Sequence, residues 1–337
     1  MRCHNKLTSA AVWLWLVMLL ISNLACATTG AYAGVNTGAN TGADTQALSG
    51  TEIMQQATSR QQIYPHVYEE QTLILMDKTG NKDVRSTRRY TRIDNDKSIR
   101  LLLVFDSPQE VRGVALLVIN EEAKGKPLVS GIYLPAFGDR LFSSTKSGYS
   151  DKFLGSDFSI YDLQPENIED FSYTRLEDIQ VEEIPYYQVE SKPANQQVLK
   201  KTGYFKRVHT VSKDRKLIIS TDYYDSYNRL YKTLSRHDFV KYDQTTWWPN
   251  MLLMENHLDK HQTLVKVNNR VFSIDYVPLK MFSKNWLFAH NHMASTIRHL
   301  FDNTLSAPPD LNDPNDTNDP LEPKTQPDFK PNLEAGD

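Results

Sequence analysis

Hydrophobic and polar residues alternate over much of the chain between residues 65 and 275. Short runs rich in Val, Ile, Tyr, Thr and Leu recur in this region, and Gly, Asn, Asp and Pro separate them. This pattern is typical of antiparallel strands joined by turns, and it shows no repeated strand-helix unit. The sequence therefore predicts an α+β fold that is mainly antiparallel β, with strands over residues 67–76, 82–93, 101–105, 114–119, 131–134, 141–144, 186–190, 204–211, 217–224, 229–239, 251–256 and 264–274.

Three local signals refine this prediction. Residues 101–105 are continuously apolar, which predicts a strand buried on both faces. Helix-capping patterns, in which Ser precedes an acidic residue by three positions, begin at Ser49 and at Ser159. The first predicts a short N-terminal helix. The second predicts that the segment FLGSDFSIYDL, residues 153–163, is a turn that leads into a helical turn, with its aromatic residues packed around it.

A further amphipathic helix is predicted over residues 284–301. Its apolar residues recur at helical spacing, and they are Trp286, Leu287, Met293, Ile297 and Leu300. Such a helix either packs on the body of the protein or lies at a membrane surface.

The two ends of the chain differ from the body in composition. Residues 1–27 resemble a secretory signal peptide, with a basic start, an apolar run and small residues at the cleavage spacing. Cleavage after Ala27 removes both cysteines, and the alternative is a lipid anchor on Cys26. Residues 28–48 predict a flexible linker because Gly, Thr and Ala dominate them. Residues 302–337 contain seven of the sixteen prolines and nine acidic residues, which predicts a disordered acidic tail.

The formal net charge of −3 is unevenly distributed, because the acidic tail leaves the body slightly positive. This weak field gives little support to nucleic-acid binding, so no nucleic-acid partner is expected. One stretch is strongly basic, with arginines at positions 85, 88, 89, 92 and 100. These arginines either bind phosphate, attract anionic lipid head groups weakly, or cover the outer face of a strand pair beside Asp83, Asp94 and Asp96. We expect the last of these roles.

The sequence contains none of the common catalytic motifs, such as a Gly-x-Ser-x-Gly elbow, a His-Glu-x-x-His zinc motif or a phosphate-binding loop. His257 and His261 stand four residues apart, but they flank a strand end, where helical ligand geometry is lost. A serine nucleophile at Ser156 would need a positioned base, which no neighbouring residue supplies. We therefore expect no enzymatic activity, no metal and no cofactor.

The segment FDSPQEVRGVALL, residues 105–117, and the segment GIYLPAFGDRLFSSTKSGYSDKFLGSDFSIYDL, residues 131–163, carry a specific set of motifs. In these motifs the chain resembles the outer-membrane lipoprotein-sorting-like family, which is related to the LolA and LolB carriers. The matching residues are Ser107, Pro108, Gly113, Ala115, Leu116 and Leu117; Tyr133 to Ala136; Ser143, Ser144 and Gly148; and Phe153, Gly155 to Phe158, Asp162 and Leu163. The likeness covers a predicted domain over residues 49–283.

The resemblance implies a half-open β-barrel wrapped over short helices, whose concave apolar face shelters acyl chains. It implies a carrier in the periplasm of a Gram-negative bacterium, with lipid or lipoprotein acyl chains as partners, transient membrane contact and an RND-type exporter nearby. We expect the groove to be lined by Leu116, Val118, Tyr133, Phe153, Phe158, Met251 and Met254. The family motif residues with a structural role would be Gly113, Pro135, Gly155, Ser156, Asp157 and Asp162. In the alternative, the protein is an accessory subunit of the exporter, and a helix containing Trp286 and Ile297 plugs the groove.

Overall fold

The structure is a computed structural model, and it describes residues 47–294 except for 62, 123–124, 127 and 144–151. The predicted signal peptide with Cys26, most of the linker and the acidic tail lie outside the described residues, as do Ser144, Gly148, Ile297 and Leu300. No helix within the described part of the chain is long and apolar enough to span a membrane.

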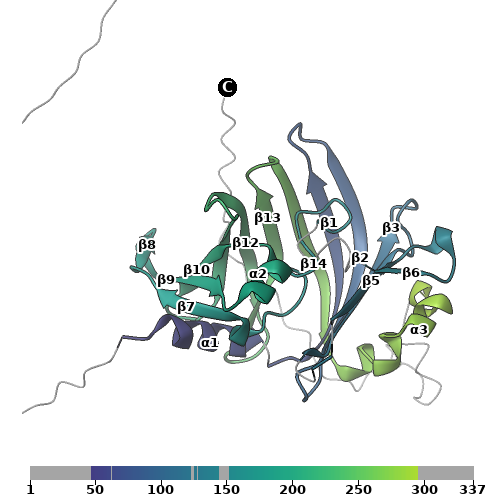
Figure 1. Ribbon diagram of the computed structural model, residues 1–337, viewed down its shortest axis with the longest axis horizontal. Helices are drawn as coiled ribbons and strands as arrows, with labels where there is room; N and C mark the ends of the chain where they lie inside the picture. The colour runs from purple at the N-terminus through teal and green to yellow at the C-terminus, as the bar shows by residue number, and fades with distance from the viewer. Residues whose placement is uncertain (1–46, 62, 123–124, 127, 144–151, 295–337) are drawn as a thin grey trace, which may run out of the picture. The chain divides into compact units, whose positions relative to one another are not determined.

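The described residues form one antiparallel sheet of 14 strands. The strand order is β6-β5-β4-β3-β2-β1-β14-β13-β12-β11-β10-β9-β7, with β8 paired to β9 (Figure 1). The strands are β1 His66–Met76, β2 Lys82–Ile93, β3 Ile99–Ser107, β4 Ala115–Asn120, β5 Val129–Tyr133, β6 Leu141–Ser143, β7 Phe171–Arg175, β8 Ile179–Val181, β9 Ile184–Pro193, β10 Lys206–Ser212, β11 Ile218–Tyr224, β12 Leu230–Lys241, β13 Trp247–Asn256 and β14 His261–Phe272. Because the edge strands β6 and β7 are not paired with each other, the sheet stays open, and the predicted half-open antiparallel fold is confirmed.

The sheet has two faces, which we call inner and outer. Inner-face side chains of β3 and β4 share one buried cluster with Tyr223 of β11 and Leu234 of β12, although several strands lie between them. The sheet must therefore curve around this face. Two segments cover it: helix α1, Gly50–Gln61, which packs on β9, β10 and β11, and residues 152–166, which we call the inner loop.

Helix α1 begins as the capping pattern predicts. The backbone N–H of Glu52 donates to Ser49 Oγ at 3.2 Å, and the backbone N–H of Ser49 donates to the Glu52 carboxylate at 2.8 Å. These two bonds satisfy donors that a helix N-terminus otherwise leaves free. The buried side of the helix consists of Ile53, Met54 and Ala57, each with no exposed area.

The outer face is covered at β1 to β5 by residues 274–293. This segment contains the 3₁₀ turns Ile274–Tyr276, Leu279–Met281 and Asn291–Met293 and helix α3, Lys284–Phe288. Trp286 and Leu287 are buried against Tyr90 and Leu102, so the predicted packing on the body is confirmed. The helix is shorter than the predicted range 284–301, because His290 turns to a φ of 56°. Residues 295–301 lie outside the described part.

Strand β3 confirms the prediction made for residues 101–105. Leu101, Leu103 and Phe105 belong to the inner cluster, whereas Leu102 and Val104 belong to the outer one, and all five are at most 3% exposed. Three elements were not predicted: β7, β8 and helix α2, Gln196–Thr202. Both strands are short, and β7, with the sequence FSYTR, lacks an apolar run.

Candidate functional site

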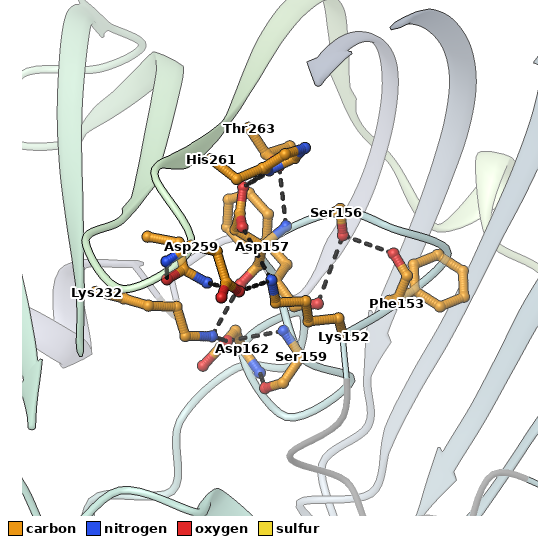
Figure 2. A network of polar contacts seen from close by, with 12 residues as sticks. Lys152, Phe153, Ser156, Asp157, Ser159, Asp162, Lys232, Asp259, His261 and Thr263 are labelled. Atoms are coloured by element: carbon orange, nitrogen blue, oxygen red, sulfur yellow. Dashed lines mark hydrogen bonds and ion pairs between the residues drawn. The ribbon is translucent and has the colours of Figure 1, made fainter. Parts of the chain in front are cut away.

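The family motif FLGSDF forms the start of the inner loop and lies against the inner face (Figure 2). Gly155 has a φ of +81°, a left-handed conformation that strains other residues. This turn lets Ser156 fold back, and its hydroxyl donates to the carbonyl of Phe153 at 2.7 Å. Phe153 and Phe158 then point into the inner cluster, at 3% and 4% exposure.

Asp157 fixes this loop to strand β14. Its side chain has no exposed area, and one carboxylate oxygen accepts the Thr263 hydroxyl at 2.8 Å and meets His261 Nδ1 at 2.5 Å. The backbone N–H of Asp157 donates to the Thr263 hydroxyl at 2.9 Å. Lys152 lies 3.8 Å from the other carboxylate oxygen, so a cation stands beside the buried carboxyl group (Figure 2).

Asp162 fixes the other end of the motif. Its carboxylate accepts the backbone N–H of Ser159 at 2.8 Å and the Tyr204 hydroxyl at 2.8 Å, and it forms an ion pair with Lys232 at 3.3 Å. Lys232 Nζ also donates to the carbonyl of Asp157 at 2.8 Å. The reciprocal bonds of Ser159 and Asp162 are those of the predicted capping box, and residues 160–163 form a hydrogen-bonded turn that does not extend into a regular helix.

Ser156, Asp157 and His261 are residue types of a hydrolase triad, yet their bonds do not connect them in that order. The Ser156 hydroxyl is directed at backbone carbonyls of Phe153 and Phe158, at 2.7 and 3.5 Å, and is 3% exposed. An activated serine needs its hydroxyl bonded to a base, and the bonds of Ser156 lead elsewhere. His257, the other histidine of the pair, bonds to Thr233 at 2.9 Å. The contacts of Ser156 and Asp157 hold the inner loop in place.

Desolvation lowers the pKa of Lys152, but its hydrogen bond to Asp259 and the charges of Asp259 and Asp157 together raise this pKa above its ordinary value. Lys152 thus stays charged beside the buried Asp157 carboxylate. The network surrounds the buried Asp157 carboxylate with a cation and hydrogen-bond donors, and such an arrangement is costly to break.

The structure brings together five of the seven predicted groove residues. They lie in the inner cluster at 0–4% exposure, and they are Leu116, Val118, Phe153, Phe158 and Met254. Tyr133 lies on the outer face, where its ring packs near Phe288 and His292. Met251 is half-buried and stands three positions from Met254 on β13, so the two side chains point to opposite faces.

Gly113 and Pro135, the other predicted motif residues, lie beneath the C-terminal segment. Gly113 has a φ of +80°, and a Cβ atom there would lie 2.4 Å from Met293 Sδ and 3.1 Å from Pro135 Cγ. Pro135 begins the 3₁₀ turn Pro135–Phe137. The glycine thus allows residues 291–293 to pack closely on the sheet.

Two cavities remain between the inner face and the inner loop. The larger has a volume of about 230 Å³ and the smaller about 130 Å³. Phe153, Phe158 and Leu163 of the inner loop line the smaller one, opposite Leu101 and Leu103. The residues shared by both linings, which make the cavities neighbours, are Gln71, Arg89, Asp162, Leu234, Arg236 and Leu252. The inner loop therefore leaves unfilled space between itself and the inner face of the sheet.

Charged residues that the sequence patterns missed also line the larger cavity. Glu69 pairs with Arg270 at 2.7 Å, and Glu166 pairs with Arg207 at 2.7 Å. Burial lowers the pKa of Arg207, but the charge of Glu166 and nearby tyrosines raise this pKa above its ordinary value. The larger cavity is therefore apolar on some walls and strongly charged on others.

The expected outer-face role of the five arginines holds for three of them. Arg88 pairs with Asp106, and Arg92 and Arg100 both pair with Asp94, on the outer side of the sheet. The expectation is wrong for the other two, Arg85 and Arg89, which point inward because their odd positions on β2 face the opposite way. The alternation of side chains along a strand is the sequence signal that could have identified these two inward-pointing arginines.

The comparisons with known proteins agree with this architecture. A family model described as an uncharacterized protein matches residues 97–288, which is more than half of the chain. The structure of a domain assigned to outer membrane lipoprotein sorting, from Vibrio parahaemolyticus, is 24% identical with a TM-score of 0.64, and the match covers 71% of this chain and 98% of that chain. No curated protein matches the chain.

Two further structures have the same fold. A DUF1329 family protein from Desulfovibrio piger is 24% identical with a TM-score of 0.60, and the match covers 68% of this chain and 98% of that one. A LolA superfamily protein from Nitrosomonas europaea is 15% identical with a TM-score of 0.58, over 71% of this chain and 100% of that one. At these identities the likeness establishes the fold, and the predicted LolA-like fold is confirmed. The chain belongs to the family of the matching model, whose members are described as uncharacterized proteins, and it has the fold of the DUF1329 family structure.

Proposed function

We propose that this protein is a non-enzymatic carrier of a hydrophobic ligand, and that it works in the periplasm of a Gram-negative bacterium. The observation that carries the proposal is the pair of adjoining cavities between the inner loop and the inner face of the open sheet. Their volumes together reach the lower end of the range of ligand pockets, about 300–1,000 Å³. A guest there would touch Leu234 and Leu252, which line both cavities.

Elementary energetics explains why such a shelter is useful. Each methylene group removed from water contributes about 0.8 kcal/mol, so ten buried methylenes contribute about 8 kcal/mol. An acyl chain cannot cross water efficiently without cover of this kind. The proposed ligand is therefore a lipid or the acyl chain of a lipoprotein, and its release needs a membrane or a partner that offers equal cover.

The relatives support this proposal without deciding the cargo. The Vibrio parahaemolyticus domain is assigned to outer membrane lipoprotein sorting, and the Nitrosomonas europaea protein belongs to the LolA superfamily. The five inward-facing residues of the predicted groove agree with an apolar interior, although Leu116, Val118 and Met254 line neither cavity. Phe153 and Phe158 do line one, and they are the strongest of the proposed contacts.

A second candidate function is that of an accessory subunit of an RND-type exporter without its own cargo. One observation favours it, because the inner loop already fills much of the space that a guest would need. The plug that the sequence suggested for this role is wrong, since Trp286 packs on the outer face. Residues of the inner loop, such as Phe153 and Phe158, would be the plug.

The test is to purify the protein from its native host, extract it with organic solvent and measure bound lipid by mass spectrometry. Leu252→Trp should fill the space at the junction of the cavities and reduce the lipid content severalfold. Leu253→Trp is the matched control, because Leu253 is half-buried on the opposite face of the same strand. Equal lipid content in all three proteins would contradict the proposed site, and no lipid in the wild type would favour the accessory role.

A further inference from the structure

Two guanidinium groups at the junction of the cavities have no carboxylate partner among the described residues. Arg89 of β2 and Arg236 of β12 line both cavities. The hydrogen bonds that they make go to neutral groups: Arg89 donates to the carbonyl of Leu163 at 2.8 Å, and Arg236 donates to the Thr221 hydroxyl at 3.3 Å. Arg89 Nε is buried without any hydrogen-bond partner.

The carboxylates that line the larger cavity are already paired with other cations. Glu69 pairs with Arg270, Glu166 with Arg207 and Asp162 with Lys232, at 2.7, 2.7 and 3.3 Å. Glu69 is bound further by Gln71 Nε2 at 2.8 Å, and Asp162 by the Tyr204 hydroxyl. The charges of these pairs cancel, so the two remaining guanidinium groups leave an excess of positive charge at the junction.

This excess is costly in the unliganded protein. Burial lowers the pKa of Arg89 and of Arg236, and the charges of Glu69 near Arg89 and of Glu166 near Arg236 offset this lowering only in part. Buried cations are ordinarily paired with an anion, and an unpaired one destabilises the fold. A bound anion would remove this penalty, and guanidinium groups bind carboxylate and phosphate oxygens in a bidentate fashion.

Apolar walls lie on both sides of these two groups. On one side lies the smaller cavity, with Leu73, Leu101, Leu103, Phe153 and Phe158 in its lining, and on the other side lie Val67, Val267 and Trp248. A free inorganic anion would not use these walls. A molecule with a charged head and a hydrocarbon chain would use both the arginines and the walls.

We infer that the junction binds the anionic head, a carboxylate or a phosphate, of an amphiphile whose hydrocarbon chain lies in the adjoining apolar space. Arg89 and Arg236 hold the head, and the inner loop residues Phe153, Phe158 and Leu163 cover the chain. The inference rests on the proposed carrier function and specifies its ligand class. It distinguishes this site from a purely apolar groove, which would accept neutral and anionic lipids alike.

The experiment titrates delipidated wild-type protein with decanoate, decyl phosphate, 1-decanol, acetate and inorganic phosphate by calorimetry. Hydrogen bonds to charged groups predict that decanoate or decyl phosphate binds about tenfold to a hundredfold more tightly than decanol. The one of the two that binds more tightly identifies the head as carboxylate or phosphate. Arg89→Gln and Arg236→Gln should each remove most of this preference while leaving decanol binding unchanged.

Two further variants separate ligand binding from a structural role. Arg85→Gln is the matched control, because Arg85 lies on the same strand and face, pairs with Asp83 and lines neither cavity. This variant should keep the preference. Arg89→Lys keeps the charge but loses the planar fork, so it should keep part of the preference. If Arg89 were only structural, Arg89→Gln would lower the melting temperature and leave the ratio of the two affinities unchanged.

Each contrary result has one meaning. Equal affinity for decanoate, decyl phosphate and decanol in the wild type would overturn the anionic-head inference and leave the carrier function standing. Binding of acetate or inorganic phosphate as tightly as decanoate would also overturn it, because the site would then be a simple anion site. Failure to bind any of the three long-chain compounds would overturn the carrier function itself, together with the inference.

Discussion

Replacing Asp157 by alanine should destabilise the protein, because this side chain fixes the inner loop to strand β14. The side chain has no exposed area, and it accepts hydrogen bonds from Thr263 and meets His261 Nδ1 at 2.5 Å. Removing it leaves the Thr263 hydroxyl without this acceptor and leaves Lys152 without one of its two counter-charges. A buried donor that loses its acceptor costs about 1–3 kcal/mol.

This cost converts into a measurable shift. A protein of this size loses about 2–4 °C in melting temperature for each kcal/mol, so Asp157→Ala should lower it by about 2–12 °C. The assay is urea unfolding followed by circular dichroism, with thermal melting as a second measurement. Asp157→Asn keeps the shape of the side chain and should cost less than alanine, because the amide can still accept the Thr263 hydroxyl.

Asp259→Ala is the control for this prediction. Asp259 also pairs with Lys152, but its side chain is 52% exposed, and exposed pairs contribute about 0–1 kcal/mol. If Asp157→Ala unfolds at the same urea concentration as the wild type, the network does not fix the loop and the reasoning fails. If both variants lose equal stability, burial is not the source of the effect.

Three other predictions concern different parts of the fold. Burial, together with the charges of Arg207 and Arg236, holds the pKa of His209 well below its ordinary value, so the unfolded chain binds a proton first as pH falls. The stability from this residue is complete above about pH 6.5 and falls below it by up to about 1.4 kcal/mol per pH unit; His209→Gln should flatten the pH dependence of the urea midpoint, and an unchanged slope would refute this cause. Gly155→Ala forces a φ of +81° on alanine and should cost about 1–2 kcal/mol in the same assay, whereas Gly80→Ala, also at positive φ but in an exposed hairpin, tests whether the loop adds to that cost. Leu116→Asp should prevent folding, since Leu116 has no exposed area and a buried unpaired carboxylate costs several kcal/mol, so soluble protein with native circular dichroism would contradict its place in the inner cluster.

Much of the sheet could be predicted because its signals are local. Strand β2, Lys82–Ile93, and the buried strand β3 follow directly from the pattern of apolar residues and turn residues. The capping box at Ser49 also acts within three residues. Strand β7 was missed because most of its side chains are polar, and β8 was missed because it has only three residues; pairing with β9 stabilises both.

The candidate site was harder to predict, because its decisive contacts connect distant residues. Asp157 meets Thr263 across 106 positions, and the pattern FLGSDF gives no hint of that partner. The groove prediction also paired Met251 with Met254, although strand alternation places them on opposite faces. The same rule separates Arg89 from Arg88, and applying it to β2 would have identified an inward-pointing arginine.

Strands β3 and β4 lie in the middle of three layers, whereas the described residues cover β10, β11 and β12 on the inner side only. Backbone amides in β3 should therefore exchange with deuterium only when the whole domain opens, and those near the β7 edge should exchange through smaller fluctuations. Of the two arginines at the junction, Arg89 lies on β2, in the part of the sheet that is covered on both faces, and Arg236 lies on β12, in the part covered on one face. An amphiphile bound to both arginines would connect the less stable part of the sheet to the more stable part. Its binding should therefore slow amide exchange in β10 to β12.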